Sequence, residues 1–160
     1  MPDYVFVYGT LRRGEINDIA LAAARQGLPV PRLAGLAGVP GVLYDFGDWP
    51  GLADDAQAPP VAGEVYEIDP RLLPVLDEIE EYAPGRDCLF VRRRVTLALD
   101  APAGSAETPA GRAGKETAGD GAGRVDCWYY PIDLRLAGRA QRTQARDWVA
   151  YRLERGPAPA

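Results

Sequence analysis

The chain has 160 residues, which fits one domain covering residues 1–160. Its formal net charge of -5 and pI near 4.8 argue against a nucleic-acid partner, because phosphate binders present a basic face. No apolar run reaches the roughly 20 residues that cross a membrane, and the N-terminus lacks a secretory signal pattern. Two cysteines are too few for a disulfide framework. We therefore expect a cytoplasmic protein without a membrane partner.

The first half of the chain predicts strands and one short helix. Residues 4–8 are β-branched and aromatic, which indicates a buried strand. Residues 18–26 predict a helix with Asp18 as its N-cap. Glycine and proline divide the following region into two short strands and a turn, at residues 31–36, 42–44 and 47–51.

The second half continues this mixture. Strands are predicted at residues 61–68, 90–99 and 124–130, and helices at residues 70–82 and 139–154. In the first of these helices Asp69 is the expected N-cap and Pro70 the first helical residue, with regular helix delayed until Pro74. Since strands and helices do not alternate regularly, the pattern favours a mixed α+β fold over a doubly wound sheet.

Residues 101–123 differ from the rest in composition. Ala, Gly, Pro, Thr and Glu dominate, and no periodic apolar pattern is present. We expect a low-complexity insertion between two strands that buries almost no apolar surface.

The chain contains no histidine. This excludes Ser-His-Asp and Cys-His catalysis and the histidine-based zinc motifs. The only lysine, Lys115, lies in the low-complexity segment, where a desolvated amine is not expected. If the protein is an enzyme, a carboxylate is the favoured base, and nothing in the sequence implies a metal or an organic cofactor.

The bend after the first strand is a candidate binding loop. Residues 7–14 leave the strand through Gly9, which tolerates unusual backbone angles and close approach of a ligand. Consecutive N–H groups at such a bend can form a nest for an anion. An ordinary strand-ending turn is the alternative explanation of the same residues, and the spacing alone favours it.

Helical phase selects one of the four carboxylates near the end of the 70–82 helix. At 100° per residue, Glu80 falls inside the arc of apolar residues, whereas Asp77, Glu78 and Glu81 fall outside it. An inward acid is costly unless it is partnered or functional. Glu80 is therefore either a catalytic acid or base, or a rim glutamate bound to backbone or arginine.

Several motifs together resemble the gamma-glutamylcyclotransferase-like family. The sequence at Tyr8, Gly9, Thr10 and Leu11 resembles the family's opening motif. Residues 76–82 resemble its Leu-Asp-x-x-Glu-Gly-Tyr pattern, with Glu81 where the family prefers Gly. Residues 127–130 and 147–148 resemble two later elements.

The resemblance implies a small, mostly antiparallel β-barrel with flanking helices. It implies that backbone amides of the loop bind the glutamyl carboxylate of a substrate, and that Glu80 is the catalytic proton acceptor. The expected substrate-binding residues are Tyr8, Gly9, Thr10, Leu11 and Tyr130. For Tyr130, a core position and a hydrogen bond to the catalytic acid remain equal alternatives.

The expected function is that of a cofactor-independent enzyme, without metal, that releases 5-oxoproline and an amine from a γ-glutamyl amine or peptide. The alternative is a non-catalytic small-molecule binding or regulatory module on the same fold. A protein-interaction role for residues 101–123 is a third, weaker hypothesis. The sequence identifies neither the leaving amine nor the oligomeric state.

Overall fold

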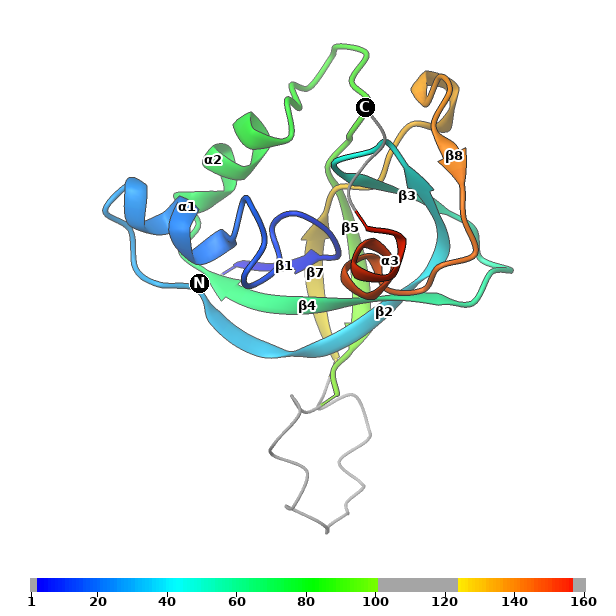
Figure 1. Ribbon diagram of the computed structural model, residues 1–160. Coiled ribbons are helices and arrows are strands. Elements are labelled where there is room, and N and C mark those ends of the chain that lie inside the picture. Colours follow the sequence, from blue (N-terminus) through cyan, green and yellow to red (C-terminus); the bar gives the residue numbers. More distant parts are fainter. Residues whose placement is uncertain (1–2, 101–123, 157–160) are drawn as a thin grey trace, which may run out of the picture.

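A single curled sheet forms the frame of the protein (Figure 1). The computed structural model describes residues 3–100 and 124–156. The strand order is β3-β2-β4-β1-β7-β5, with β8 paired to β2. The strands are β1 (Asp3–Val7), β2 (Arg32–Asp45), β3 (Pro50–Asp54), β4 (Pro60–Ile68), β5 (Arg93–Ala98), β7 (Arg124–Tyr129) and β8 (Gln141–Arg142). The helices are α1 (Ile19–Arg25), α2 (Leu72–Ile79), α3 (Trp148–Arg155) and the short 3-10 turn η2 (Leu134–Leu136).

All strand pairs except β1 with β7 are antiparallel. Together with the three α-helices around the curled sheet, this confirms the predicted α+β fold with a mostly antiparallel, barrel-like sheet. None of the helices in residues 3–100 and 124–156 is long and apolar enough to cross a membrane.

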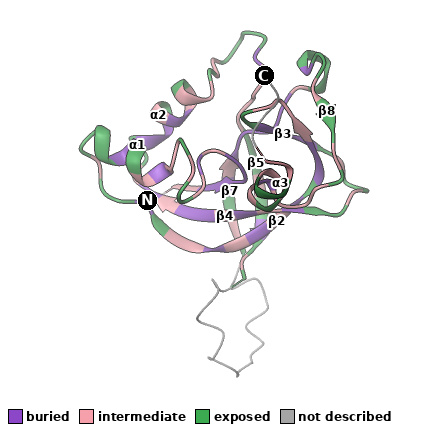
Figure 2. Ribbon diagram, viewed as in Figure 1, coloured by how far each residue is buried: buried purple, intermediate pink, exposed green. Residues whose placement is uncertain are grey.

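The sheet carries a hydrophobic core on each face, as the buried central strands in Figure 2 show. Side chains alternate along β1, so Val5 and Val7 face one core while Phe6 faces the other, together with Tyr8 directly after the strand. Helices α1 and α2 cover the first core, and α3 covers the second through Trp148. The two cores fix the end of β1 between α2 and β3, where the candidate site lies.

Strand β2 corrects the prediction of two short strands at residues 31–36 and 42–44. It runs unbroken over 14 residues, and its glycines mark places where neighbouring backbone comes close. At Gly41 an added Cβ would lie 2.6 Å from the carbonyl oxygen of Ala53 on β3. The turn predicted at residues 47–51 ends earlier, because Pro50 and Gly51 already belong to β3.

Helix α2 begins at Leu72, so the expectation that regular helix waits for Pro74 is wrong. Pro74 is the third helical residue. A backbone N–H at this position would have no partner within the helix, so the N–H that proline lacks costs no hydrogen bond. The N-cap is Arg71 rather than Asp69. The Asp69 carboxylate instead accepts the Arg71 N–H at 2.9 Å in the preceding turn.

The last helix is shorter than the predicted range of residues 139–154. Residues 141–142 form β8 against β2, and Thr143 binds the carbonyl of Leu43 through its N–H and its hydroxyl. Asp147 then caps α3 by accepting the Ala150 N–H at 3.1 Å. The pairing with β2 keeps the preceding segment extended. At the other end of the chain, α1 begins after Asp18, as predicted.

The predicted insertion at residues 101–123 lies outside the described residues. Of its flanks, Ala98 on β5 pairs with Arg124 on β7. The assignment of residues 1–160 to a single domain stays a prediction.

Candidate functional site

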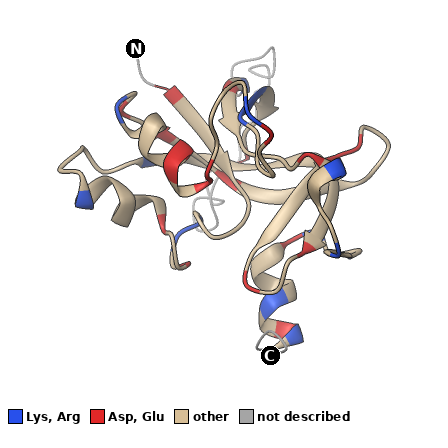
Figure 3. Ribbon diagram, turned by 90° about the horizontal axis from the view of Figure 1, so that it is seen from above, with Lys and Arg blue, Asp and Glu red and all other residues tan. Residues whose placement is uncertain are grey.

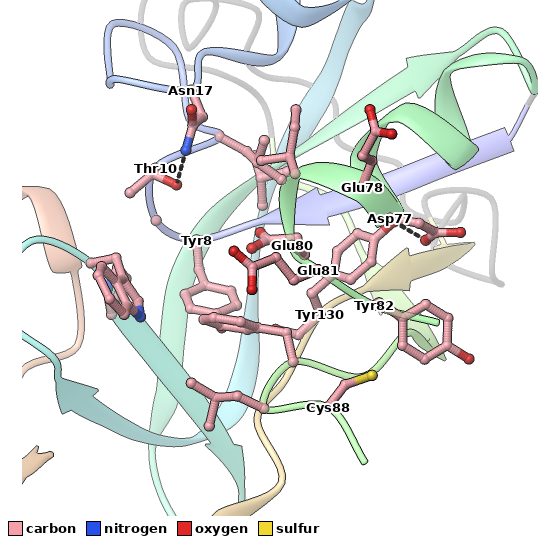
Figure 4. A pocket seen from close by; sticks show the side chains of 18 of the residues that line it. Tyr8, Thr10, Asn17, Asp77, Glu78, Glu80, Glu81, Tyr82, Cys88 and Tyr130 are labelled. Carbon is pink, nitrogen blue, oxygen red and sulfur yellow. Dashed lines mark hydrogen bonds between the residues drawn. The ribbon is translucent and has the colours of Figure 1, made fainter. Parts of the chain in front are cut away.

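A cavity of about 1220 Å³ lies where the loop after β1, the end of α2 and the start of β3 meet. Figure 4 shows it from close by. The structure brings together in its wall all the predicted site residues, which are Tyr8, Gly9, Thr10, Leu11, Glu80 and Tyr130.

The loop at Gly9, Thr10 and Leu11 turns its carbonyl groups toward the protein. Each of the three carbonyls accepts a backbone N–H at 2.9–3.0 Å, from Arg12, Asn17 and Ile19 respectively. The N–H groups of the same three residues donate no hydrogen bond within the described part of the chain. The side chain of Asn17 also donates to the Thr10 hydroxyl at 3.1 Å (Figure 4). The loop thus keeps three consecutive N–H donors available in the cavity wall.

Glu64 on β4 anchors this loop from behind. Its carboxylate accepts the Arg13 N–H at 3.1 Å, the Arg12 Nε at 3.2 Å and the Tyr66 hydroxyl at 2.8 Å. Arg12 also reaches Asp147, the N-cap of α3, at 3.0 Å. One network of hydrogen bonds and ion pairs therefore fixes the loop to both β4 and α3.

Gly9 also sets the distance between the loop and β3. A Cβ built at Gly9 would lie only 2.5 Å from the Cγ of Pro50. Any other residue there would push β3 away from the loop. Glycine at this position thus lets the turn that carries Asp48 and Trp49 form part of the cavity wall.

Glu80 is the C-cap residue of α2 and is partly buried in the cavity wall. In Figure 4 it lies beside Tyr8 and Tyr130. Its carboxylate accepts no hydrogen bond from the described residues, so nothing offsets the loss of water around it. Burial, and secondly the charge of Glu81, raises the pKa of Glu80 to about 7.

Glu81 occupies the left-handed position that ends α2, with φ of 58°. Its N–H binds the Glu78 carbonyl at 3.1 Å, and the Tyr82 N–H binds the Asp77 carbonyl at 2.8 Å. These two bonds form a Schellman motif, in which glycine is the usual residue at the left-handed position. The turn is therefore preserved although Glu81 replaces the glycine of the resembled pattern.

Asp77 was missed as a site residue. It accepts the Tyr130 hydroxyl at 2.7 Å and an Arg92 nitrogen at 2.7 Å. The alternative that Tyr130 hydrogen-bonds Glu80 is therefore wrong, since its proton goes to Asp77. Asp77 precedes Glu80 by three residues, so the two share a helix face, and this spacing is the signal that could have found it.

Tyr8 joins the cavity floor to the sheet. Its hydroxyl donates to the Tyr130 carbonyl at 2.8 Å and accepts the Leu52 N–H at 3.0 Å. Burial, and then the nearby Glu80 charge, raises the pKa of Tyr8. Tyr8 therefore stays a neutral phenol whose proton is already engaged. In residues 3–100 and 124–156, no three His, Cys, Asp or Glu side chains lie close enough to hold a metal ion.

A family model described as gamma-glutamyl cyclotransferase, AIG2-like matches residues 5–150. The chain belongs to this family. The match includes the loop, the end of α2 and Tyr130, so all the lining residues of the cavity except Arg152 lie in the part of the chain that the gamma-glutamyl cyclotransferase, AIG2-like model covers.

Individual proteins named as cyclotransferases are similar to parts of this chain. A gamma-L-glutamyl-butirosin B gamma-glutamyl cyclotransferase from Niallia circulans is 42% identical over 87 residues, covering 53% of this chain and 50% of that protein. The human gamma-glutamylaminecyclotransferase is 37% identical over 111 residues, covering 66% of this chain and 70% of the human one. The chain therefore matches only about half the length of the bacterial relative.

A solved AIG2-like protein from Mus musculus has the same fold. Its crystal structure superposes with a TM-score of 0.63 and covers 99% of this chain and 96% of the mouse chain. At 18% identity, this likeness concerns the fold alone.

Proposed function

We propose that this protein is a γ-glutamyl cyclotransferase that uses Glu80 as its proton acceptor. The substrate is a γ-glutamyl amine or peptide, and the products are 5-oxoproline and a free amine. One juxtaposition carries the proposal: a carboxylate with a pKa of about 7 shares a cavity with three unpaired backbone N–H groups. Family membership supports it independently.

The loop at Gly9, Thr10 and Leu11 holds the negatively charged part of the substrate. Its three N–H donors suit a carboxylate, because backbone N–H groups in a fixed bend bind anions without changing shape. With the α-carboxylate bound there, the γ-glutamyl chain folds within the cavity. The network around Glu64 keeps the donors in place.

Glu80 supplies the proton transfer. The substrate's α-amino group lies next to its own α-carboxylate, which raises the amine pKa above the peptide value of about 8, so it enters mostly protonated at neutral pH. A carboxylate with a pKa of about 7 is well matched to accept that proton, because general bases work best near the operating pH.

The freed amine then attacks the γ-carbonyl carbon of the same molecule. A new C–N bond closes the five-membered lactam, and the original bond to the leaving nitrogen breaks. Glu80 gives its proton to that nitrogen as the bond breaks. The attacking nitrogen loses a second proton as the lactam forms, and the released amine takes up one proton to become an ammonium ion, so the carboxylate is regenerated and no cosubstrate is consumed. Since the reaction is intramolecular, holding the folded conformer supplies much of the rate acceleration.

The test is mass-spectrometric detection of 5-oxoproline from a panel of γ-glutamyl amines and dipeptides. For an active substrate, Glu80→Gln should lower kcat by at least about 100-fold, because a positioned general base contributes about 10²–10⁴-fold. Glu78→Gln is the matched control on the same helix end, and it should retain most of the rate.

Substrate binding to Glu80→Gln should survive, since the loop amides do not depend on that charge. Full turnover by this variant would rule out Glu80 as the base. Binding of γ-glutamyl compounds by the wild-type protein without release of 5-oxoproline would favour the binding or regulatory module instead.

A further inference from the structure

Two walls of the cavity are connected to each other only weakly. One is the loop of residues 9–17 that carries the three N–H donors, and the other is the β2–β3 turn, whose residues 48–50 line the cavity. Within the described ranges 3–100 and 124–156, no hydrogen bond joins residues 9–17 to residues 46–50. The close approach of Gly9 to Pro50 limits how near the walls can come, but it does not hold them together.

Helix α3 binds the first of these walls. Arg152 donates to both carboxylate oxygens of Glu15, at 2.9 and 2.7 Å. Asp147, the N-cap of the same helix, accepts a guanidinium N–H of Arg12 at 3.0 Å. The side chain of Glu15 is only 10% exposed, so water and salt screen its ion pair weakly. The loop is thus attached to α3 at two points.

The end of α3 binds the second wall. Arg155, its last residue, donates to both carboxylate oxygens of Asp45, at 2.8 and 2.7 Å, and to the Gly47 carbonyl at 2.9 Å. The Tyr151 hydroxyl donates to the same carboxylate at 2.7 Å. Asp45 also accepts the Gly47 N–H at 2.7 Å, and its side chain is only 8% exposed. The β2–β3 turn is therefore fixed to α3 where the turn begins.

The helix that joins the two walls is itself firmly seated. Trp148 is buried in the second core, and the Arg155 guanidinium lies over the rings of Trp148 and Tyr151, at 5.5 and 5.7 Å. Arg152 and Arg155 are three residues apart, so they lie on one face of the helix. Figure 3 shows arginines in blue on this helix, next to the C-terminus. One short element thus connects two segments that are about 30 residues apart in the sequence.

We propose that α3 is a clamp that sets the separation of the two cavity walls, with Arg152 and Arg155 as positioning residues for the reaction. This inference rests on the proposed cyclotransferase function. The loop donors bind the carboxylate end of the substrate, whereas Glu80 is positioned separately, through the bond between Tyr130 and Asp77. Release of the clamp therefore weakens substrate binding more than it slows the chemical step.

Arg155 is the decisive position for kinetics. Of the described residues that line the cavity, neither Arg155 nor Asp45 is one, so any effect on substrate is indirect. Arg155→Gln and Asp45→Asn should each raise KM at least fivefold and change kcat less than about twofold. Arg155→Lys keeps the charge but not the forked donor geometry, so its KM should lie between those of Arg155→Gln and the wild type.

Arg135→Gln is the matched control. It breaks an ion pair between Arg135 and Asp133, which are two residues apart, so this pair connects no separate segments. Arg135 also lies outside the cavity wall. This variant should leave both KM and kcat within about twofold of the wild type.

Hydrogen exchange followed by mass spectrometry tests the clamp without a substrate. In the described part of the chain, Arg155 forms no hydrogen bond with residues 9–18. If α3 couples the walls, Arg155→Gln should still speed amide exchange at least threefold in residues 9–18, as well as in residues 45–49. Exchange in β1 should stay unchanged, which excludes a merely global loss of stability.

The outcomes separate this inference from the proposed function. Faster exchange confined to residues 45–49, equally faster exchange in β1, or an unchanged KM for an active substrate would overturn the clamp and leave the cyclotransferase function intact. Faster exchange in both walls, without 5-oxoproline from any γ-glutamyl compound and the wild-type protein, would support the clamp and reject the catalytic function.

Discussion

The Tyr130 hydroxyl donates a 2.7 Å hydrogen bond to Asp77, one helical turn before Glu80. Tyr130 is buried and directly follows β7, so this bond ties the last turn of α2 to the sheet. Arg92 holds the other oxygen of Asp77 and stacks on Trp128, with 4.7 Å between the guanidinium carbon and the ring centre. The orientation of the Glu80 side chain thus depends on the hydrogen bond between Tyr130 and Asp77, in which Glu80 itself takes no part.

Tyr130→Phe should lower both stability and activity. Losing a hydrogen bond to a charged group costs about 1.5–3 kcal/mol of unfolding free energy. A displaced Glu80 should lower kcat/KM by about tenfold or more, since small misplacements near a reacting centre are costly. Urea denaturation and 5-oxoproline release measure the two effects.

Tyr129→Phe is the matched control, because the Tyr129 hydroxyl makes an equally short 2.7 Å bond to Asp54 and does not line the cavity. It should lose similar stability and keep its activity. An equal loss of kcat/KM in both variants would show that activity follows global stability rather than the position of α2.

Glu80→Gln should stabilise the folded protein at high pH. The pKa of Glu80 rises from 4.5 to about 7 on folding, so the folded state binds this proton more tightly. Stability from this group is therefore complete below pH 4.5 and is lost as the pH rises through 7. The variant has no such proton, and its advantage over the wild type should grow by about 2–3 kcal/mol between pH 5 and pH 8.

Denaturant unfolding of both proteins at pH 5, 6, 7 and 8 checks this prediction. Glu78→Gln, on the exposed side of the same turn, serves as the comparison. A difference in stability that stays constant with pH would mean that Glu80 ionises in the folded state as it does in the unfolded chain.

Glu81 offers two substitutions that separate charge from backbone strain. Glu81→Gln removes the charge that helps to raise the pKa of Glu80, so the acid limb of the rate profile should move to lower pH. Glu81→Gly does the same and also relieves the left-handed backbone at φ of 58°, which should add about 1 kcal/mol of stability. Thermal unfolding and pH–rate profiles of the two variants distinguish the effects, and no gain for glycine over glutamine would indicate an unstrained turn.

Glu64→Gln should weaken substrate binding more than chemistry. Glutamine can no longer attract Arg12 by charge, so the loop that carries the three N–H donors loses part of its anchor. We expect KM to rise about tenfold, kcat to change less than about threefold, and stability to fall by about 1–3 kcal/mol. Glu67→Gln, on the same strand in an exposed pair with Arg32, should stay within about 0.5 kcal/mol and leave KM unchanged.

Local chemistry explains which features the sequence predicts well. Helical phase and apolar alternation depend on neighbouring residues, so the end of α1 and the position of Glu80 could be predicted. The continuity of strand β2 could not be predicted. Gly41 is required there because β3 packs closely against it, and secondary-structure propensities do not include contacts between strands. By propensity alone glycine predicts the end of a strand, whereas in this sheet it allows the neighbouring strand to pack closely.

The remaining errors have the same origin. The segment before α3 is extended because β8 pairs with β2, about 100 residues earlier in the chain. Trp49 reads as part of a turn in the sequence, and only the contact of Pro50 with Gly9 brings it to the cavity. Long-range pairing of this kind leaves no periodic signal in the sequence.

Because the pKa of Glu80 is raised to about 7, proton uptake and release by this one carboxylate can be measured near neutral pH. Between pH 6 and 8 ordinary carboxyl groups are ionised and phenols and guanidinium groups are protonated, and this chain has no imidazole to titrate in that interval. In a potentiometric titration from pH 6 to pH 8, the wild type should therefore release close to one proton per molecule more than Glu80→Gln. The terminal amine contributes equally to both proteins. Ligands that enter the cavity alter this difference, so proton exchange with the buffer reports occupancy without a chromophore or a label.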